Sequence, residues 1–565
     1  MKFNEFKYER LDLEDIKNEY GSLLNELKEC TDVDSFNEVF KRINKYRAHL
    51  NTMVQLCYIR HSIDTSDTFY DEEQSYWDNT LPEVQVYETD FFKICLNFKK
   101  RSELKIPEVF FKQAEYSLKT FDEKIIEDLQ EENRLSSEYG KLKASAKIEF
   151  NGEVYNLASI ESQFSSSDRN IRQEAYKAYA KFFEDNEDKF DDIYDKLVKV
   201  RDRMAKKLGY ESFIELGYLR MNRFDYDKEM VSNYRKQVVD VIVPIATEIY
   251  EKQAKRIGVD RLEAYDVNYK FRSGNPKPVG DEKTLVNKAL KMYEEMSKET
   301  AEFFNVMVEN DLFDLTTKPH KQMGGYCTEL LDYKVPFIFS NFNGESGDVN
   351  VLTHEAGHAL QSYLSLKEID IPDLTFPSME SCEIHSMSME FFAFPYLNDF
   401  FGKDGDKYAY EELSGALTFL PYGCLVDHFQ HEVYANPELS PKERKELWRR
   451  LEKMYKPHLS YDDIAVFERG AFFFKQGHIF ENPFYYIDYT LAQVCALQFY
   501  KRFVDKDENY FNDYLQICRL GGTKTFVGLV REAGLKSPFE DGCLSSIAGT
   551  IKEEMEKYES LLVEE

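Results

Sequence analysis

Long apolar runs are missing from this chain of 565 residues. A membrane-spanning helix needs about 18 consecutive apolar residues, and because no such run occurs we expect no membrane span. The first ten residues carry charges where a secretory signal peptide would need its apolar stretch. The nine cysteines are odd in number and follow no pairing pattern, which is typical of a reducing compartment and not of a disulfide framework. These features predict a cytoplasmic protein.

Positive charge is also scarce in this chain. There are 73 lysines and arginines against 103 aspartates and glutamates, so the formal net charge is -30. A surface of this charge repels nucleic acid and anionic lipid. We therefore expect no nucleic-acid partner and no membrane partner.

The spacing of apolar residues is mostly that of helices. The chain is longer than a single simple core accommodates, so we expect a mainly α protein with two lobes, an N-terminal helical lobe over residues 1–200 and a second helical lobe over 201–565. A surface loop is expected at 273–280 because of its glycines and prolines. Helices are predicted within 11–60 (two helices, the second with Ser35 as a cap), 107–143, 169–255 and 282–310.

Two segments interrupt the helical pattern. Residues 146–157 alternate between apolar and polar around Asn151-Gly152, which indicates a β-hairpin. Residues 335–344 are apolar and aromatic but contain Pro336, and because proline lacks a donor for the ladder we expect an edge strand there. An edge strand offers backbone groups to which an extended peptide could add as a further strand. A structural hairpin with residues 324–326 fits the same pattern.

The most informative stretch is Thr353-His354-Glu355-Ala356-Gly357-His358. On an α-helix, residues four apart lie on one face, so His354 and His358 can both bind one metal ion. Glu355 lies beside them, where it can take a proton from a metal-bound water. Gly357 costs about 1 kcal/mol against alanine inside a helix, which predicts that another segment packs closely there. Two helix histidines with a solvated glutamate between them are the alternative interpretation.

A catalytic zinc needs a third protein ligand, and the distance to that ligand separates the families. A metzincin would have glycine and histidine where Gln361 and Leu364 stand. A glutamate about twenty residues after His358, as in the thermolysin-like gluzincins, is missing too, because Pro377 and Ser378 occupy those positions. Both of these classes are therefore excluded.

Three acids remain further along, namely Glu380, Glu383 and Glu390. Glu383 and Glu390 are seven apart, two helical turns, and therefore share a helix face. One of them could bind the metal while the other orients a ligating histidine.

With this spacing the chain resembles the thimet oligopeptidase and oligoendopeptidase F family of zinc metallopeptidases. In that family the third ligand is a glutamate that corresponds to Glu383, and a further acid seven residues later corresponds to Glu390, with Glu380 as the rival ligand. Three other segments resemble family landmarks, at 167–175, 203–210 and 321–327, and the resemblance covers residues 160–545.

The resemblance implies a zinc-dependent endopeptidase that hydrolyses internal bonds of short unfolded peptides. One zinc per chain would be held by His354, His358 and Glu383, with Glu355 as general base and Glu390 supporting a ligand. The implied fold is a large helical two-lobed ellipsoid with a deep central substrate channel and a small β-sheet beside the metal helix. The lobe over 201–565 would carry the zinc site.

A segment near the C-terminus matches the family's oxyanion-stabilising groups. There a histidine and two tyrosines face the zinc, and His478, Tyr486 and Tyr489 correspond to them, although the spacing from the histidine is one residue shorter than in the thimet-type pattern. A phenol that donates to an oxyanion in a dry site can contribute roughly 3 kcal/mol. Because the chain holds 38 tyrosines and 44 phenylalanines, an aromatic helix face that merely packs in the core is the alternative.

Three further interpretations remain open. A zinc carboxypeptidase or dipeptidyl carboxypeptidase could use the same ligands on a similar fold, but it would need a cation that grips the terminal carboxylate of the substrate. A non-catalytic helical scaffold that binds peptides would be expected to have lost a ligand or Glu355, and neither is lost. Imidazole and carboxylate ligands also accept cobalt or manganese in place of zinc.

Overall fold

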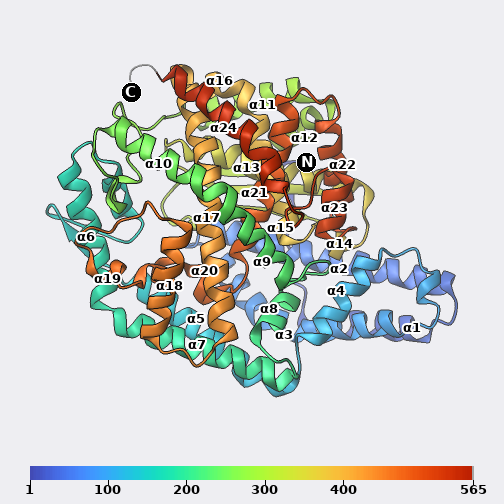
Figure 1. Cartoon of the computed structure of the whole chain (residues 1–565). Helices are drawn as coiled ribbons and strands as arrows, with labels where there is room; N and C mark the ends of the chain where they lie inside the picture. The colour runs from blue at the N-terminus through green and yellow to red at the C-terminus, as the bar shows by residue number, and fades with distance from the viewer. Residues whose placement is uncertain (563–565) are drawn as a thin grey trace. The chain divides into compact units, whose positions relative to one another are not determined.

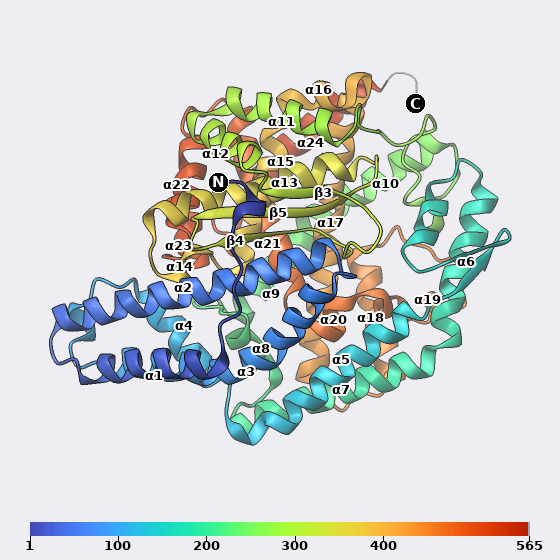
Figure 2. The ribbon, with the colours of Figure 1, turned by 180° about the vertical axis from the view of Figure 1, so that it is seen from behind.

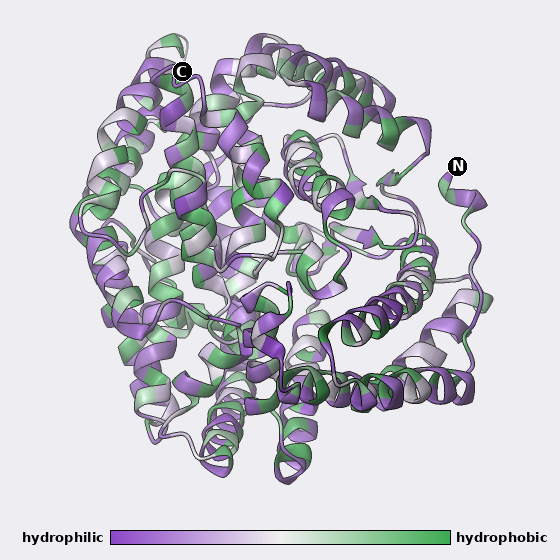
Figure 3. Cartoon of the chain, turned by 90° about the vertical axis from the view of Figure 1, so that its right-hand side faces the viewer, coloured by the Kyte–Doolittle hydropathy of each residue, from purple (hydrophilic) through white to green (hydrophobic). Residues whose placement is uncertain are grey.

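A computed structural model of the chain describes residues 1–562. The prediction of a mainly α protein is confirmed, because helices dominate and the described strands form one two-stranded and one three-stranded sheet (Figure 1). The ellipsoid shape and the deep channel stay predictions. The helices have a hydrophobic and a hydrophilic side (Figure 3), as expected for helices that bury one face. Within the described residues, no helix combines the length and the apolarity needed to cross a membrane.

Internal contacts divide the chain into two compact units. The first comprises Met1–Leu118, Lys277–Gly405 and Cys495–Lys536, and the second comprises Lys119–Pro276, Asp406–Val494 and Ser537–Glu565. The lobe boundary predicted near residue 200 stays a prediction, and that residue lies inside a helix.

The first unit contains the three-stranded sheet and helices from three separate stretches of the chain. Its elements are α1 (Leu13–Glu29), α2 (Val33–Ile63), α3 (Thr68–Asn97), α4 (Glu108–Lys119), α11 (Glu282–Met296), α12 (Lys298–Glu309), β3 (Phe313–Thr316), β4 (Tyr326–Leu330), β5 (Val335–Phe342), α13 (Gly347–Glu368), α14 (Pro372–Thr375), α15 (Met379–Phe392), α16 (Leu397–Phe401), α22 (Tyr510–Leu520) and α23 (Phe526–Glu532).

The first long helices begin at aspartates. Asp12, Asp32 and Asp67 each accept a hydrogen bond from a backbone N–H of the first turn, which satisfies a donor that has no partner inside the helix. The two helices predicted within 11–60 are thus confirmed as α1 and α2. Ser35 is not the cap of α2, because it lies in the first turn and donates its own N–H to Asp32.

The three-stranded sheet has the order β3-β5-β4, so β5 lies in the middle (Figure 2). The prediction of an edge strand at 335–344 was therefore wrong. The central strand tolerates Pro336 because β3 pairs with β5 only from Ile338 onward, which leaves Pro336 with a strand partner on one side. The two edges belong to β3 and β4. Strand β4 follows Gly324-Gly325 and pairs antiparallel with β5, as the hairpin interpretation expected, and its other side is a free edge of the sheet.

The second unit is helical apart from one hairpin. Its elements are α5 (Ile126–Ala144), β1 (Ile148–Phe150), β2 (Glu153–Tyr155), α6 (Arg169–Asp185), α7 (Glu187–Leu208), α8 (Phe213–Arg220), α9 (Lys228–Gln237), α10 (Val243–Ile257), α17 (Gly405–Ala435), α18 (Pro441–Tyr455), α19 (Ala465–Glu468), α20 (Gly477–Glu481) and α24 (Cys543–Leu561), while α21 (Tyr486–Val504) begins in this unit and ends in the first. Helices α5 and α7 lie side by side (Figures 1 and 2).

The hairpin confirms the prediction for residues 146–157. Asn151 and Gly152 both have positive φ, 51° and 82°, as a two-residue turn between twisted strands requires. The loop at 273–280 is also confirmed. The helical stretch predicted over 107–143 consists of two helices, α4 and α5, which belong to different units.

Candidate metal centre

The helices α13 and α15 approach each other closely in the first unit (Figure 1). Gly357 makes this approach possible, since a Cβ atom at this position would lie 2.5 Å from the carbonyl oxygen of His385 and 2.7 Å from the Cα of Ser386. The predicted need for a small residue is confirmed. The contact brings the middle of α15 against the face of α13 that carries the two histidines.

Three of the predicted residues converge between these helices. The ligand atoms of His354, His358 and Glu383 all lie within 4.8 Å of one another. The Oε2 atom of Glu383 is 3.4 Å from Nε2 of His354 and 3.6 Å from Nε2 of His358. Within the described part of the chain, these three residues are the group of histidine, cysteine and acidic side chains with this geometry, and Glu380 is not a member.

The spacing fits a small divalent cation. Zinc bonds of about 2.1 Å in a tetrahedron place neighbouring ligand atoms about 3.4 Å apart, close to the separations measured between Glu383 and the two imidazoles. Two imidazoles and one carboxylate also suit zinc chemically, as well as cobalt and manganese. The residues present therefore fit such an ion and would leave a fourth position for a water or substrate.

Two further side chains of α15 support this group. Nδ1 of His354 is 2.6 Å from Oε1 of Glu390, so the carboxylate fixes the ring with Nε2 directed to the ligand group. The hydroxyl of Ser386 donates to Oε2 of Glu383 at 3.0 Å. Glu390 therefore lies where the sequence placed it, beside a histidine.

The two histidines titrate in opposite directions. Burial alone would lower the pKa of His354, but Glu383 and Glu390 hold it well above its ordinary value. Burial lowers the pKa of His358 to about 3, because Glu383 only partly offsets it. The hydrogen bond from His354 and the charges of both histidines outweigh burial at Glu383 and lower its pKa to about 2. A carboxylate and a neutral imidazole are the forms that bind metals, and these pKa shifts favour them at Glu383 and His358, whereas His354 would release a proton when it binds an ion.

Glu355 is buried next to the ligand group, and its Oε2 atom has no hydrogen-bond partner among the described residues. Burial raises its pKa to about 7, with His354 lowering it and Glu383 raising it. Its Oε1 atom would be 3.7 Å from a Cβ at Gly325, the residue that precedes β4. A carboxyl with this pKa next to a metal group is suited to exchanging protons near neutral pH.

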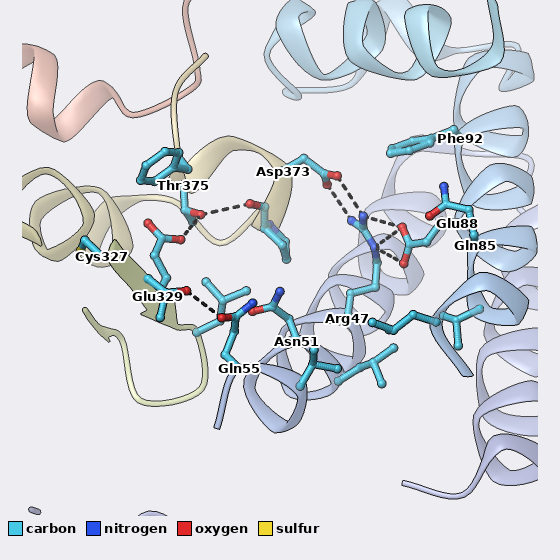
Figure 4. A pocket seen from close by; sticks show the side chains of 18 residues that line it. Arg47, Asn51, Gln55, Gln85, Glu88, Phe92, Cys327, Glu329, Asp373 and Thr375 are labelled. Carbon is cyan, nitrogen blue, oxygen red and sulfur yellow. Dashed lines mark hydrogen bonds and ion pairs between the residues drawn. The ribbon is translucent and has the colours of Figure 1, made fainter. Parts of the chain in front are cut away.

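A cavity of about 730 Å³ extends along β4 in the first unit (Figure 4). Phe376, whose ring centroid is 6.3 Å from that of His358, lines the cavity and links it to the ligand group. Arg47 forms ion pairs with Glu88 and Asp373 on its wall. The open edge of the sheet thus borders a space that reaches the neighbourhood of the histidines.

Glu329 of β4 projects into the lining of the same cavity (Figure 4). Its Oε2 atom accepts a hydrogen bond from Thr375 at 2.7 Å, while Oε1 is buried without a partner among the described residues. Burial raises its pKa to about 7. The cavity therefore contains an acid that gives up its proton only near neutral pH.

The remaining predicted residues cluster in the second unit. The ring centroids of His478 and Tyr486 are 4.8 Å apart, and Tyr489 lies 5.9 Å from His478 and 5.8 Å from Tyr486. The Nε2 amide of Gln476 is 2.8 Å from Nδ1 of His478. Burial raises the pKa of Tyr486, so its phenol stays protonated and able to donate. The three residues form one group, and their role stays a prediction.

Three contributors to these groups were not predicted from the sequence. Ser386 lies one helical turn after Glu383, a spacing that could have indicated a contact. Gln476 precedes His478 by two residues and carries no comparable signal. Gly325 was noted within a family landmark and as part of a hairpin but not as a site residue, and its place beside Glu355 depends on how β4 packs against α13.

Two protein-family models match most of the chain. Residues 3–121 match the model of the peptidase M3 N-terminal domain, and residues 162–549 match that of peptidase family M3. A protein of Borreliella burgdorferi (strain ATCC 35210 / DSM 4680 / CIP 102532 / B31) named oligoendopeptidase F homolog is 24% identical over 396 residues. That match spans 67% of this chain and 64% of the relative's length.

Solved structures match over nearly the whole chain. PZ peptidase A with an inhibitor is 49% identical with a TM-score of 0.90, and the match covers 98% of this chain and 99% of the other. A Bacillus anthracis str. Ames protein provisionally named oligoendopeptidase F is 46% identical with a TM-score of 0.86, covering 99% of each chain.

Proposed function

Since this chain belongs to peptidase family M3, we propose that it is a zinc-dependent endopeptidase that hydrolyses internal bonds of short unfolded peptides. The observation that carries the proposal is the convergence of His354, His358 and Glu383 within 4.8 Å. The unpartnered carboxyl oxygen of Glu355 beside them supplies the base that hydrolysis needs. The relatives named oligoendopeptidase F and PZ peptidase support the same reaction class.

His354, His358 and Glu383 would hold the zinc, one ion per chain. When bound, zinc supplies a Lewis acid that polarises a carbonyl and makes a water molecule more acidic. Glu390 keeps the Nδ1 proton of His354 in place, so that Nε2 offers its lone pair to the ion. Ser386 holds the Glu383 carboxylate in a fixed rotamer through its hydrogen bond.

Glu355 would act as the general base and then as the general acid. Its carboxyl group is buried beside the ligand group with one oxygen unpartnered among the described residues, where it can accept a proton from the attacking water and return it to the leaving amine. Its burial excludes bulk water from the proton transfer. Glu355 is therefore the residue on which turnover depends most.

Tyr486 and Tyr489, together with His478, would donate hydrogen bonds to the developing oxyanion. Gln476 bonds Nδ1 of His478, so the ring carries its proton on Nε2, where it is available to a ligand. Tyr422 donates to Oε1 of Gln476 at 2.8 Å and thereby fixes the orientation of the amide. Donors held in advance stabilise charge without reorganisation during the reaction.

The substrate backbone would pair with the open edge of β4, and not with β5 as the sequence predicted. Gly325, the residue directly before β4, lies beside Glu355, and β4 lines the cavity of the first unit. Pairing through main-chain atoms is indifferent to side-chain identity. We therefore expect broad sequence preference.

A carboxypeptidase or dipeptidyl carboxypeptidase is the alternative, and a non-catalytic scaffold is a remote one. The test is digestion of a mixture of short peptides, each with a free and an amidated C-terminus, by the zinc-loaded protein with and without chelator. The proposal expects internal cleavage of both forms and loss of cleavage with chelator. Cleavage confined to free C-termini would favour the alternative, and binding without cleavage would favour a scaffold.

A further inference from the structure

A second cavity, of about 350 Å³, lies wholly within the second unit. Aromatic side chains form much of its wall, including Tyr176, Tyr250 and Phe419, and two lysines, Lys456 and Lys475, also line it. Aromatic walls with a few convergent polar groups are typical of ligand sites. The composition suits a ligand with an apolar body and a negative charge.

Both lysines lack an ion-pair partner in the part of the chain that the structure describes. Among the described residues, neither Nζ forms an ion pair or a hydrogen bond, although Glu161 also lines the cavity. Their nearest partners are rings, because Lys475 lies over Phe472 at 4.6 Å and Lys456 over Tyr422 at 5.5 Å. The chain as a whole carries a net charge of -30, yet Glu161, the carboxylate that lines the same cavity, forms no ion pair with either lysine.

The surroundings disfavour the charged form of these lysines. Burial lowers the pKa of Lys475 to about 8, and Lys456 and Lys143 lower it further while Glu161 opposes them. Burial also lowers the pKa of Lys456, with Glu452 as the opposing charge. An anion that entered the cavity would remove this cost by compensating both ammonium groups.

The cavity adjoins the predicted oxyanion group. Tyr422 lines the cavity and donates to Gln476, which bonds His478. The ring centroids of Phe419 and Tyr422 are each 5.8 Å from that of Tyr486. A peptide whose scissile bond lies at Tyr486 would therefore reach the cavity with a residue a few positions away along its chain.

We propose that this cavity binds the C-terminal carboxylate of short peptide substrates, with Lys456 and Lys475 as the cations and the aromatic wall holding the last side chain. The inference rests on the proposed function, because it specifies which end of the peptide substrate is recognised beside the proposed oxyanion group. It also supplies the terminal-carboxylate cation that the carboxypeptidase alternative requires. The result is an endopeptidase that prefers bonds a few residues from a free C-terminus.

The main test compares one short peptide ending in phenylalanine with its C-terminal amide. For the unaltered protein we expect kcat/KM to be about tenfold higher for the free acid, as is usual for hydrogen bonds to charged groups. Lys475→Met and Lys456→Met should bring the ratio of the two substrates close to one, mainly by raising KM for the acid. Lys453→Met, an exposed position on α18, is the matched control and should keep the tenfold ratio.

A second measurement does not depend on turnover. Calorimetry with N-acetylphenylalanine and its amide should show binding of the acid only, and Lys475→Met should abolish that binding. Cleavage with equal kcat/KM for acid and amide would overturn the inference and leave the proposed function intact. If neither peptide is cleaved, the proposed function fails and calorimetry alone decides the inference. Tighter binding of inorganic phosphate than of N-acetylphenylalanine would also overturn it, since the cavity would then be a site for free anions.

Discussion

The ligand group of the first unit and the lysine-lined cavity of the second unit are opposite in charge. Glu383 and Glu390 lie within ion-pair distance of His354, and in the described part of the chain an oxygen of a third carboxyl group, that of Glu355, has no partner. The ammonium groups of Lys456 and Lys475 lie over aromatic rings, and no carboxylate of residues 1–562 lies within ion-pair distance of them. The first region therefore lacks a cation, and the second region lacks an anion.

This difference indicates what each region binds. A buried charge without a partner is costly, so a chain retains one where a ligand completes it. The first region calls for a cation, in agreement with the spacing of its ligand atoms. The second calls for an anion. Experiments that remove one charge at a time can test this division.

The largest effect should come from Glu355→Gln, which keeps the shape of the side chain but removes the base. We expect peptide hydrolysis to fall about a thousandfold, in the range usual for a general base, while metal analysis still finds one zinc per chain. Glu368→Gln, at the exposed end of the same helix, is the control. Hydrolysis at the parental rate would show that the base is another residue.

Next in size is Tyr486→Phe, which removes a predicted oxyanion donor from the second unit. We expect kcat to fall about a hundredfold with little change in KM, because a donor of this kind acts in the transition state. Steady-state kinetics measure it, with Tyr489→Phe as a second variant and Tyr155→Phe in the hairpin as control. A rise in KM at constant kcat would instead make Tyr486 a substrate-binding residue.

Glu390→Gln sharpens the comparison from the metal side. Its carboxylate holds Nδ1 of His354 at 2.6 Å, and losing such a support weakens metal binding by about 10- to 100-fold. Competition with a chelator gives the zinc affinity, independent of activity. An unchanged affinity would mean that His354 is oriented by α13 alone.

Gly357→Ala tests the packing that creates the first region. The added Cβ would meet the carbonyl of His385 at 2.5 Å, so we expect the free energy of unfolding to fall by about 2 kcal/mol, as for overpacked cores. Gly549→Ala on α24 is the matched control, because no atom lies within 4 Å of its Cβ position. That variant should be as stable as the parent or slightly more stable. Equal unfolding midpoints for the parent and Gly357→Ala would refute the close approach of α13 and α15.

The smallest expected effect is a pH dependence of stability that comes from Glu329, the acid in the cavity beside the ligand group. The pKa of Glu329 is raised by burial from 4.5 to about 7 in the folded protein, so the folded state holds a proton that the unfolded chain releases. The free energy of unfolding should therefore decrease as the pH rises from 4.5 to 7. Glu329→Gln should be more stable than the parent at pH 8, by about 1 kcal/mol after allowance for solvent screening, and no different at pH 4.5.

Thermal unfolding at pH 4.5 and pH 8 measures this difference. Glu309→Gln, at an exposed position, should show no dependence of this kind. If Glu329→Gln loses stability at pH 8, then the carboxylate is compensated by a partner and the first region is less acidic than we infer.

Contacts between residues close together in the sequence were predictable, because the local geometry of a helix or a turn alone relates them. His354 and His358 needed only the four-residue spacing, and the turn at Asn151-Gly152 only the dipeptide. Glu383 came from the resemblance to a family, since a separation of twenty-five residues from His358 follows no geometric rule. Most of the chemistry of the ligand group therefore follows from the sequence and the family resemblance together.

Contacts that depend on tertiary packing were not predictable. Pro336 suggested an edge strand, and the error arose because the partner β3 is short and leaves the proline side of β5 unpaired. Lys456 and Lys475 lie nineteen positions apart and show no pattern. Only the packing of helices and loops from distant parts of the second unit brings them into one cavity.

The short length of β4 has a consequence for how strongly any peptide can be held. This strand has five residues, and in an antiparallel pair only alternate residues direct both backbone groups to the same neighbour. A guest chain can therefore form few main-chain hydrogen bonds before it runs beyond the strand. Binding through main-chain atoms, which does not depend on the peptide sequence, therefore stays weak, and product dissociates readily. Selectivity has to arise from the termini and side chains of the bound peptide.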